Sequence, residues 1–280
     1  MSDGLKGVRK ADYRSIYYVA EKSKGYLGEE SGKVKVIEGL GSLYLPRIEK
    51  LHRIRRLLLI EGTSDLELLK IWAATLGLGW PDDLVEWFST GKPSERKTLY
   101  GELNKEIMKK QNSATLTIVR GIHALSLRDR DEEPQATTRS DLSDGSNPDV
   151  PMQAGEDFRI VHRKWRRRHI ENYLLLPRAI ARAASAKGTV YSEEDVARFL
   201  REEHSATIND TFVLTDCSQA IKDFRAKDIT YSAPNNTETK FDVTRFDIAR
   251  SMTPAEICDD VKGLLNQIVA LCTPRAGTSP

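Results

Sequence analysis

Cysteine is scarce in this sequence of 280 residues, which contains only Cys217, Cys258 and Cys272. The three show no C-x-x-C spacing and no pattern of pairs, so we expect neither a structural zinc site nor a disulfide framework. The sequence also has no apolar run that approaches the length of roughly 20 residues required for a membrane span. It has no apolar segment of the kind found in a signal peptide. These absences predict a soluble, cytoplasmic protein without a membrane partner.

Net charge is also nearly absent, because 43 lysines and arginines oppose 41 acidic residues, which gives +2. The charges are nevertheless unevenly distributed. Basic residues are concentrated at 53–56 and 162–169, and acidic residues at 129–133 and 141–157. Because each phosphate of a polyanion responds to nearby charge rather than to the total, local basic stretches of this kind favour a nucleic-acid partner.

Short apolar runs alternate with helical patterns from residue 56 onward. Residues 57–60, 84–88 and 122–127 predict strands, and residues 158–161 predict a fourth. A helix is expected directly after residue 63, where Ser64 and Glu67 have the spacing of a capping box, and a polar helix is expected at 95–110. Strands that alternate with helices predict an α/β fold with a parallel sheet and crossover helices.

The two ends of the chain have different patterns. Residues 1–50 predict an extension of short strands at 15–20 and 34–38, and residues 132–157 predict a surface loop. After residue 176 the pattern predicts a mainly helical domain. The helices expected in this part and just before it are 169–176, 179–186, 192–204 with Ser192 and Asp195 as start signals, and a last helix with Thr253 as cap, Pro254 at its first position and Glu256 completing the box.

Three acidic side chains follow two of the predicted strands. Glu61 comes after the run at 57–60, and Asp129 and Asp131 come after the run at 122–127. Sites in parallel sheets form at the carboxyl ends of strands, so these carboxylates are expected to meet there. Carboxylates held so close together favour a hard cation such as Mg²⁺, Mn²⁺ or Ca²⁺. The five histidines show no metal-binding spacing.

These motifs resemble a known family. LLLIEGTSDLELL and LSLRDRDEE resemble the two signature motifs of the Toprim fold, and RRHIENYLLLPRAI resembles the segment that follows Toprim in ATPase-coupled nucleases of the overcoming-lysogenization-defect (OLD) family. The resemblance covers residues 51–175, which we expect to form a Toprim domain between the extension at 1–50 and the helical domain at 176–280. It implies an ABC-type ATPase domain or subunit as partner, since the sequence has no G-x-x-x-x-G-K-[ST] motif.

The resemblance also implies roles for individual residues. Glu61 matches the Toprim glutamate, a metal ligand or a proton-transfer group, and Asp129 and Asp131 match the metal-binding pair. Asp65 and Glu171 match further acids that would hold a second cation. The alternative interpretations give these residues no catalytic role. Glu61 would be a solvated acid in a turn, and Asp65 and Glu171 would be acids that stabilise the first turn of a helix.

The basic stretch near residue 165 is expected to contact nucleic-acid phosphate, although such residues commonly form a solvated face. The candidate phosphate contacts are Lys164, Arg166, Arg167 and Arg168, and Lys164 is also a candidate to balance charge on the reacting phosphorus. Together these features predict a nuclease with two Mg²⁺ or Mn²⁺ ions, for which Ca²⁺ would be a non-productive substitute. The expected biological role is DNA processing or antiviral (phage) defence. A homo-oligomer is one expected form of the protein.

Three alternatives remain open at this point. The same site would serve an RNA nuclease that cuts tRNA, although DNA is the favoured substrate. A Toprim module could instead bind metal and nucleic acid without catalysis. The third alternative is a phosphatase of the haloacid-dehalogenase class that uses D-x-D as nucleophile and acid. It is disfavoured because Glu132 follows the second aspartate, where that class has a small hydrophobic residue or threonine.

Overall fold

The computed structural model describes residues 45–89, 93–109, 121–131, 159–204 and 225–272. The chain divides into two compact units, Met1–Arg53 and Ile54–Pro280. Within the first unit the described residues belong to helix α3 (Leu45–Ile54), whose last residue already lies in the second unit. The strands predicted at 15–20 and 34–38 and the loop predicted at 132–157 lie outside the described residues.

A four-stranded parallel sheet forms the centre of the second unit. Its strands are β1 (Arg56–Ile60), β2 (Val85–Phe88), β3 (His123–Arg128) and β4 (Arg159–Lys164), in the spatial order β2-β1-β3-β4. The last four residues of β1 are all buried, as expected for a central strand that is covered on both faces. The predicted parallel α/β sheet with flanking helices is therefore confirmed.

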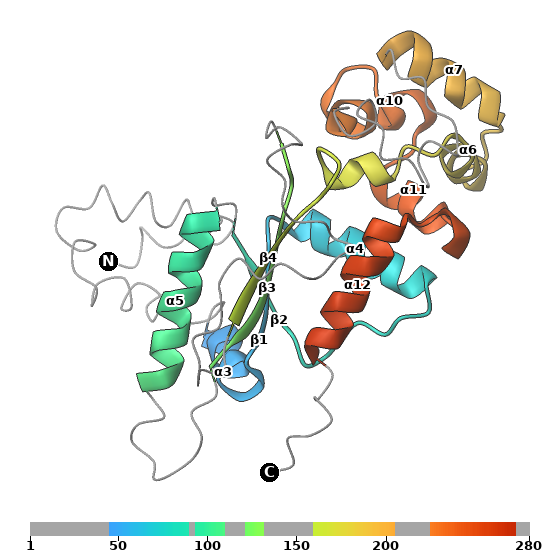
Figure 1. Ribbon diagram of the computed structural model, residues 1–280. Helices are drawn as coiled ribbons and strands as arrows, with labels where there is room; N and C mark the ends of the chain where they lie inside the picture. Colours follow the sequence, from blue (N-terminus) through green and yellow to red (C-terminus); the bar gives the residue numbers. More distant parts are fainter. Residues whose placement is uncertain (1–44, 90–92, 110–120, 132–158, 205–224, 273–280) are drawn as a thin grey trace, which may run out of the picture. The chain divides into compact units, whose positions relative to one another are not determined.

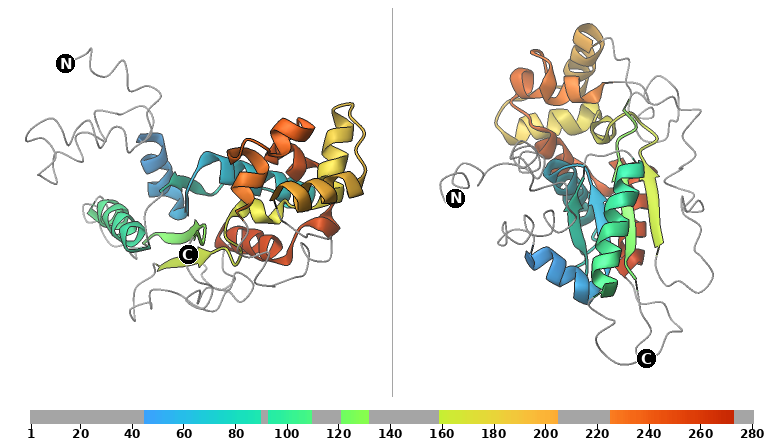
Figure 2. Two further views of the ribbon diagram at one scale, coloured as in Figure 1. Left: turned by 90° about the horizontal axis from the view of Figure 1, so that it is seen from above. Right: turned by 90° about the vertical axis from the view of Figure 1, so that its left-hand side faces the viewer.

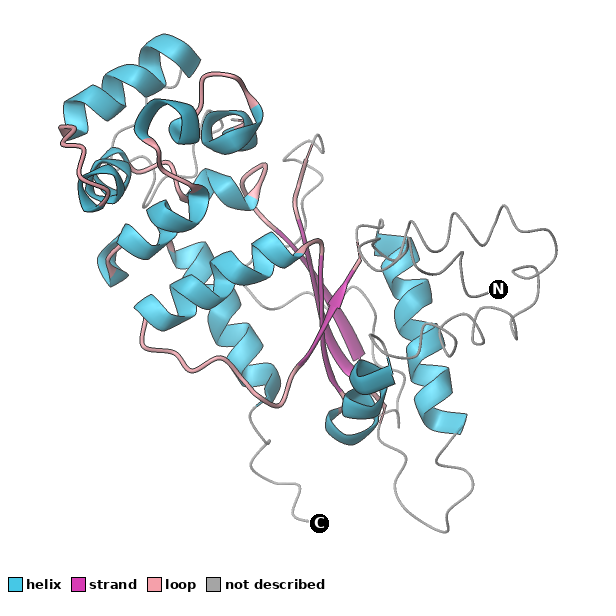
Figure 3. Cartoon of the chain, turned by 180° about the vertical axis from the view of Figure 1, so that it is seen from behind, coloured by secondary structure: helices cyan, strands magenta, loops and turns pink. Residues whose placement is uncertain are grey.

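The strand order determines which helices cover each face. The chain leaves β1 through helix α4 (Thr63–Thr75) to reach β2, and then returns through α5 (Pro93–Lys109) to β3 on the other side of β1. Right-handed crossovers in opposite directions put their helices on opposite faces. Figures 1 and 3 show α5 on one face of the sheet and α4 on the other, together with α12 (Asp259–Cys272), which contacts β1 and β3.

The chain after β4 is mainly helical. Helices α6, α7, α10 and α11 gather at one end of the sheet (Figure 2), and α11 contacts both α6 and α4. None of the helices in the described ranges is long and apolar enough to span a membrane. The elements between β4 and α12 are η3 (Ile170–Tyr173), α6 (Pro177–Ala186), α7 (Glu193–His204), the π-helix η4 (Asp228–Ser232), α10 (Thr237–Phe241), α11 (Arg245–Ser251) and η5 (Pro254–Glu256).

Two predicted helix starts have different outcomes. At α7 the prediction is confirmed, because Ser192 Oγ accepts the Asp195 N–H at 3.1 Å and the Asp195 carboxylate accepts the Ser192 N–H at 3.0 Å. At α4 the predicted Ser64 cap is wrong. Extended Gly62 is the N-cap, so the helix begins at Thr63 and Ser64 already lies in its first turn, where its Oγ donates to Asp65 at 3.3 Å.

The last predicted helix is two elements rather than one. Thr253, Pro254 and Glu256 have the predicted capping arrangement, but they form the short 3-10 turn η5, and α12 begins only at Asp259. Ile257 is extended and 1% exposed, so its burial in the core interrupts the helical path. The segment predicted as a helix at 169–176 is likewise shortened to the 3-10 helix η3.

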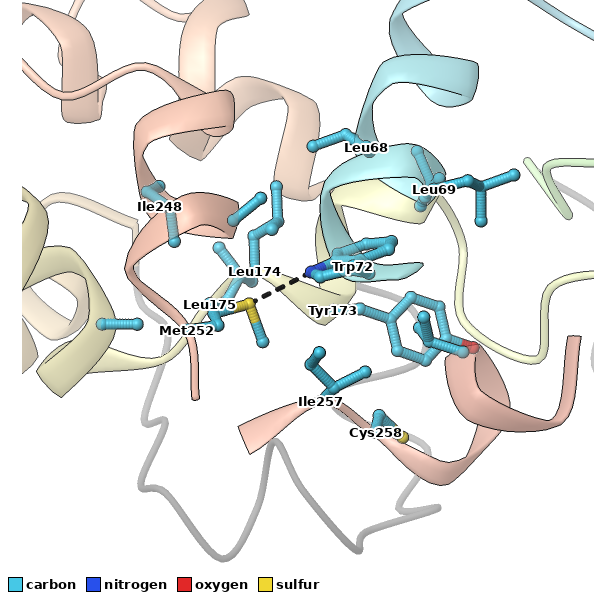
Figure 4. Packing of buried hydrophobic residues seen from close by; sticks show 14 of the residues in the cluster. Leu68, Leu69, Trp72, Tyr173, Leu174, Leu175, Ile248, Met252, Ile257 and Cys258 are labelled. Atoms are coloured by element: carbon cyan, nitrogen blue, oxygen red, sulfur yellow. Dashed lines mark hydrogen bonds between the residues drawn. The ribbon is translucent and has the colours of Figure 1, made fainter. Parts of the chain in front are cut away.

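The hydrophobic core joins the sheet side of α4 to the helices that follow β4. Figure 4 shows Trp72 of α4 packed beside Tyr173 and Leu174, with its Nε1–H donated to Met252 Sδ at 3.3 Å. All four side chains are buried. We call Trp72, Tyr173, Leu174, Met252 and Ile257 the apolar cluster; it holds η3 firmly beside α4 and η5.

Candidate metal centre

The site lies where the strand order reverses. The chain leaves the two central strands, β1 and β3, toward opposite edges of the sheet, and open parallel sheets bind ligands at the carboxyl ends of such a strand pair. Glu61 follows β1 directly and Asp129 follows β3 directly. The two strand ends are joined, because the Glu61 carboxylate accepts the backbone N–H of Asp129. Glu61 therefore lies beside the turn after β3, although the ligand atoms that come within 4.8 Å of one another in the described residues belong to Asp129, Asp131 and His169 and not to Glu61.

Asp129 is the most deeply buried of the acids at the strand ends, with 3% of its surface exposed. Its Oδ1 accepts the backbone N–H of Ile170 at 3.0 Å, and its Oδ2 accepts from Lys227 Nζ at 2.6 Å. Asp131 is exposed and has a left-handed backbone with φ of 53°, and its N–H donates to the Arg168 carbonyl at 3.0 Å. The turn after β3 thus separates the two aspartates into a buried and an exposed carboxylate.

Two further predicted acids approach from neighbouring helices. Asp65 is in the first turn of α4, and Glu171 is in η3 with 1% of its surface exposed. Glu171 Oε1 accepts from Arg245 Nη1 at 3.1 Å. Its Oε2 is buried and has no hydrogen-bond partner among the described residues. An unsatisfied buried carboxylate oxygen is costly unless a cation or donor binds it.

We call Glu61, Asp65, Asp129, Asp131 and Glu171 the carboxylate cluster. Burial raises the pKa of Glu61, and the nearby Asp131 raises it further. Burial, Glu171 and Glu61 together raise the pKa of Asp65 to about 6. Burial also raises the pKa of Asp129 well above its usual range, against the opposing effect of Lys227, while Glu171 and Asp65 add to the rise. The acids therefore lie in one another's electrostatic field, and each disfavours the ionisation of its neighbours.

Three cationic side chains compensate part of this repulsion, and none of them was predicted from the sequence. They are Arg96 beside Glu61 at 3.4 Å, Lys227 on Asp129 and Arg245 on Glu171. They come from α5, the residue before η4, and α11, so that 35, 98 and 74 residues separate them from their partners. No local spacing signals such contacts, because the tertiary fold alone brings these elements together.

Arg96 also connects the ends of three strands. Its side chain is fully buried, and it donates to the Ser89 carbonyl after β2 at 2.6 Å. It further donates to Ser126 Oγ at 3.1 Å and to the Leu127 carbonyl in β3. Burial lowers the pKa of Arg96 to about 10, which still leaves it charged at neutral pH. The guanidinium therefore keeps Glu61 in place relative to β2 and β3.

A histidine completes the immediate surroundings of the aspartate pair. Ligand atoms of Asp129, Asp131 and His169 all lie within 4.8 Å of one another. His169 is 7% exposed, and its Nε2 is 3.7 Å from Asp131 Oδ1. Burial and the nearby cations, Lys227 first among them, lower the pKa of His169 to about 3, so its imidazole is neutral. His169 could not be predicted as a ligand from the sequence because Asp129 and Asp131 are about forty residues away along the chain.

The residues predicted to bind phosphate differ in their burial and in their contacts. Lys164 ends β4 opposite Arg128 and is 7% exposed. Arg166 forms an ion pair with the buried Asp260, with Nε 3.0 Å from Oδ2. Arg167 is 2% exposed, donates to the Asn172 carbonyl at 3.0 Å and lies over the Tyr173 ring. Arg168 is only partly buried. The proposed contacts of this stretch with nucleic acid stay predictions, and Arg166 and Arg167 have internal partners.

Comparisons with protein-family models, with curated proteins and with solved structures find no match to this chain. The functional interpretation therefore depends on the chemistry of the carboxylate cluster and on the elements that position it.

Proposed function

We propose that this protein is a metal-dependent nuclease that hydrolyses phosphodiester bonds of DNA, with the carboxylate cluster as its metal centre. One observation carries the proposal: carboxylates from the ends of two central parallel strands, from α4 and from η3 lie in one another's field at the point where the strand order reverses. Hard carboxylate oxygens are the donors that Mg²⁺ and Mn²⁺ prefer.

The chemistry of the donors fits such ions. Glu171 offers a buried oxygen that lacks a partner among the described residues. Burial above all, and then the neighbouring acids, raises the pKa values of Glu61, Asp65 and Asp129. A divalent cation would turn this mutual repulsion into attraction. The proposed ligands are the five acids of the carboxylate cluster, which are enough for two ions.

Bound ions of this kind lower the pKa of a water molecule and stabilise the departing oxygen of an in-line displacement. The protein's own residues would orient the reacting groups. Arg96 and the Asp129 N–H hold Glu61, and the Ile170 N–H holds Asp129. Lys227, whose ammonium group lies at Asp129, is the proposed contact to a phosphate oxygen of the substrate, in the role predicted for Lys164.

The charge around the site supports an anionic substrate. Lys227, Arg168, Arg225 and Arg130 are all close enough to lower the pKa of His169. Cationic groups concentrated beside a metal centre raise the local concentration of a polyanion such as DNA. The protein's overall charge of +2 would give little such attraction without this concentration.

The proposal extends to the family type and to a partner. An acid after β1 and an aspartate pair after β3 are the arrangement on which the Toprim resemblance depends, and Glu171 of the I-E-N-Y segment is near enough to Asp65 and Asp129 to raise their pKa values, which supports its proposed role. We therefore also propose that the fold is of the Toprim type found in the OLD family. We propose further that the protein is coupled to an ABC-type ATPase and acts in DNA processing or phage defence. RNA is the alternative substrate.

A plasmid-nicking assay with Mg²⁺ or Mn²⁺ tests the proposal. We expect Asp129→Asn and Glu61→Gln to reduce the nicking rate by at least about 100-fold, because each removes a charge from the metal centre while nearly preserving side-chain shape. Glu67→Gln is the matched control, since Glu67 is also on α4 but is exposed and pairs with Arg250 at 3.1 Å.

Nicking that persists in folded Asp129→Asn protein would refute the assigned centre. Metal-dependent DNA binding without cutting would favour a non-catalytic module. Cleavage of tRNA but not of plasmid would change the substrate while the site stays as proposed. Circular dichroism of each variant excludes loss of fold as the cause.

A further inference from the structure

The imidazole of His169 has surroundings that are unusual for a structural histidine. The side chain is 9% exposed, yet its Nδ1 has no hydrogen-bond partner among the described residues. Its Nε2 is 3.7 Å from Asp131 Oδ1, which is too far for a hydrogen bond. Buried polar atoms are normally paired, and although His169 occupies the N-cap position of η3 opposite Asn172, its side chain makes no capping hydrogen bond there, which leaves Nδ1 available to a ligand.

The ring is also held at the aspartate pair by its position in the chain. His169 directly precedes η3, and the next residue, Ile170, donates its N–H to Asp129. On its other side, the Arg168 carbonyl accepts the N–H of Asp131. The backbone around His169 is thus bonded to both aspartates, which brings ligand atoms of the three residues within 4.8 Å of one another.

We infer that His169 is a nitrogen ligand, with Asp129 and Asp131, of a mixed nitrogen and oxygen metal site that selects Mn²⁺ over Mg²⁺. The inference rests on the proposed metal-dependent function and names the ion that binds at one position of the proposed metal centre. Mg²⁺ is a hard ion that retains water and oxygen ligands, whereas imidazole suits transition metals. Mn²⁺ accepts both kinds of ligand. A site made only of carboxylates would have a weaker preference for Mn²⁺.

Pulsed electron paramagnetic resonance of the full-length protein with Mn²⁺ tests the inference directly, because a coordinated imidazole nitrogen modulates the manganese signal. We expect nitrogen modulation in the wild type and in the control His204→Ala. His204 is the last residue of α7 and packs against Phe199. His169→Ala and His169→Asn should lose the modulation. The asparagine variant keeps a polar side chain of similar length if the alanine variant does not fold.

Competition between Mn²⁺ and Mg²⁺, followed by the signal of free Mn²⁺, measures the selectivity. Changes to groups that merely orient a ligand cost about 10- to 100-fold in metal affinity, so we expect loss of the ligand itself to lower the preference for Mn²⁺ at least about tenfold. The asparagine variant replaces nitrogen with oxygen and should lower it too, while His204→Ala should leave it unchanged.

The outcomes separate this inference from the proposed function. Mn²⁺ that binds the wild type without nitrogen modulation would overturn the histidine ligand and leave the carboxylate centre standing. Modulation that persists in both His169 variants would overturn it as well. If Mn²⁺ binds the wild type no better than it binds Asp129→Asn, the metal centre itself is wrong and both ideas fail.

Discussion

Two regions with opposite physical character meet at the short helix η3. On one side, Tyr173 and Leu174 are part of the apolar cluster with Trp72 and Met252. On the other, Glu171 is part of the carboxylate cluster, where acids raise one another's pKa values. Burial favours the first region, since apolar surface leaves water. It disfavours the second, since charged groups lose hydration.

The two regions therefore affect stability in opposite directions. The apolar cluster stabilises the fold and positions η3, whereas the carboxylate cluster reduces stability in the absence of a cation. Perturbed groups of this kind concentrate at functional sites, where proteins retain unfavourable arrangements because the chemistry requires them. Stability measurements with and without metal should therefore separate the two regions.

The largest expected effect is in the apolar cluster. Trp72→Ala should lower the free energy of unfolding by about 3–5 kcal/mol, because it leaves a cavity beside Tyr173 and Met252. Urea denaturation measures this change. Added Mn²⁺ should not reduce the difference from the wild type, since no ligand is altered. A loss below about 1 kcal/mol would mean that Trp72 is not part of a well-packed core.

The second effect concerns the cation on Asp129. Lys227→Met should lower the free energy of unfolding by about 2–3 kcal/mol in metal-free buffer, because Asp129 loses the partner of its buried carboxylate. Mn²⁺ should restore most of this loss by neutralising Asp129. Lys262→Met is the control, since Lys262 forms its ion pair with the exposed Asp259. A loss that metal does not restore would make Lys227 purely structural.

A change of the opposite sign is expected at Asp65. Its pKa of about 6 exceeds the usual value near 4, so the folded protein binds the extra proton between these two values. Stability therefore falls as pH rises from about 4 to about 6, and the full penalty is present above about 6.

Asp65→Asn should remove this penalty. We expect it to raise the free energy of unfolding by about 1–2 kcal/mol at pH 8 in metal-free buffer, allowing for solvent screening, and to have no effect near pH 4. Urea denaturation across this pH range measures it. A destabilising effect at pH 8 would show that Asp65 stabilises the fold, and the contrast between the two regions would be weaker.

The smallest effect concerns DNA binding. Arg168→Gln should reduce the salt slope of DNA affinity by about 0.9, the value for one lost phosphate contact with duplex DNA. Fluorescence anisotropy at several salt concentrations measures the slope. Arg201→Gln on α7 is the control, because Arg201 pairs with Glu194 and is exposed. Equal slopes for both variants would remove Arg168 from the nucleic-acid interface.

Much of the fold could be predicted because its signals are local. The apolar run of β1 and the alternation of strands and helices predicted a parallel sheet, and the Ser192–Asp195 box predicted the start of α7. Two predictions of helix starts fail. Ile257 is buried in the core and divides the predicted last helix, and Gly62 rather than Ser64 is the N-cap of α4.

Glu61 and Asp129 could be recognised as the acids that follow β1 and β3 because the apolar run of a strand and the residue after it are adjacent in the chain. The groups that face those acids could not be predicted in this way. Arg96, Lys227 and His169 reach them from α5, from the segment before η4 and from the start of η3. Electrostatic contacts depend on the distance between charges in space. For segments that are remote in the chain, this distance is set by how the helices pack on the sheet, and no local sequence pattern contains that information.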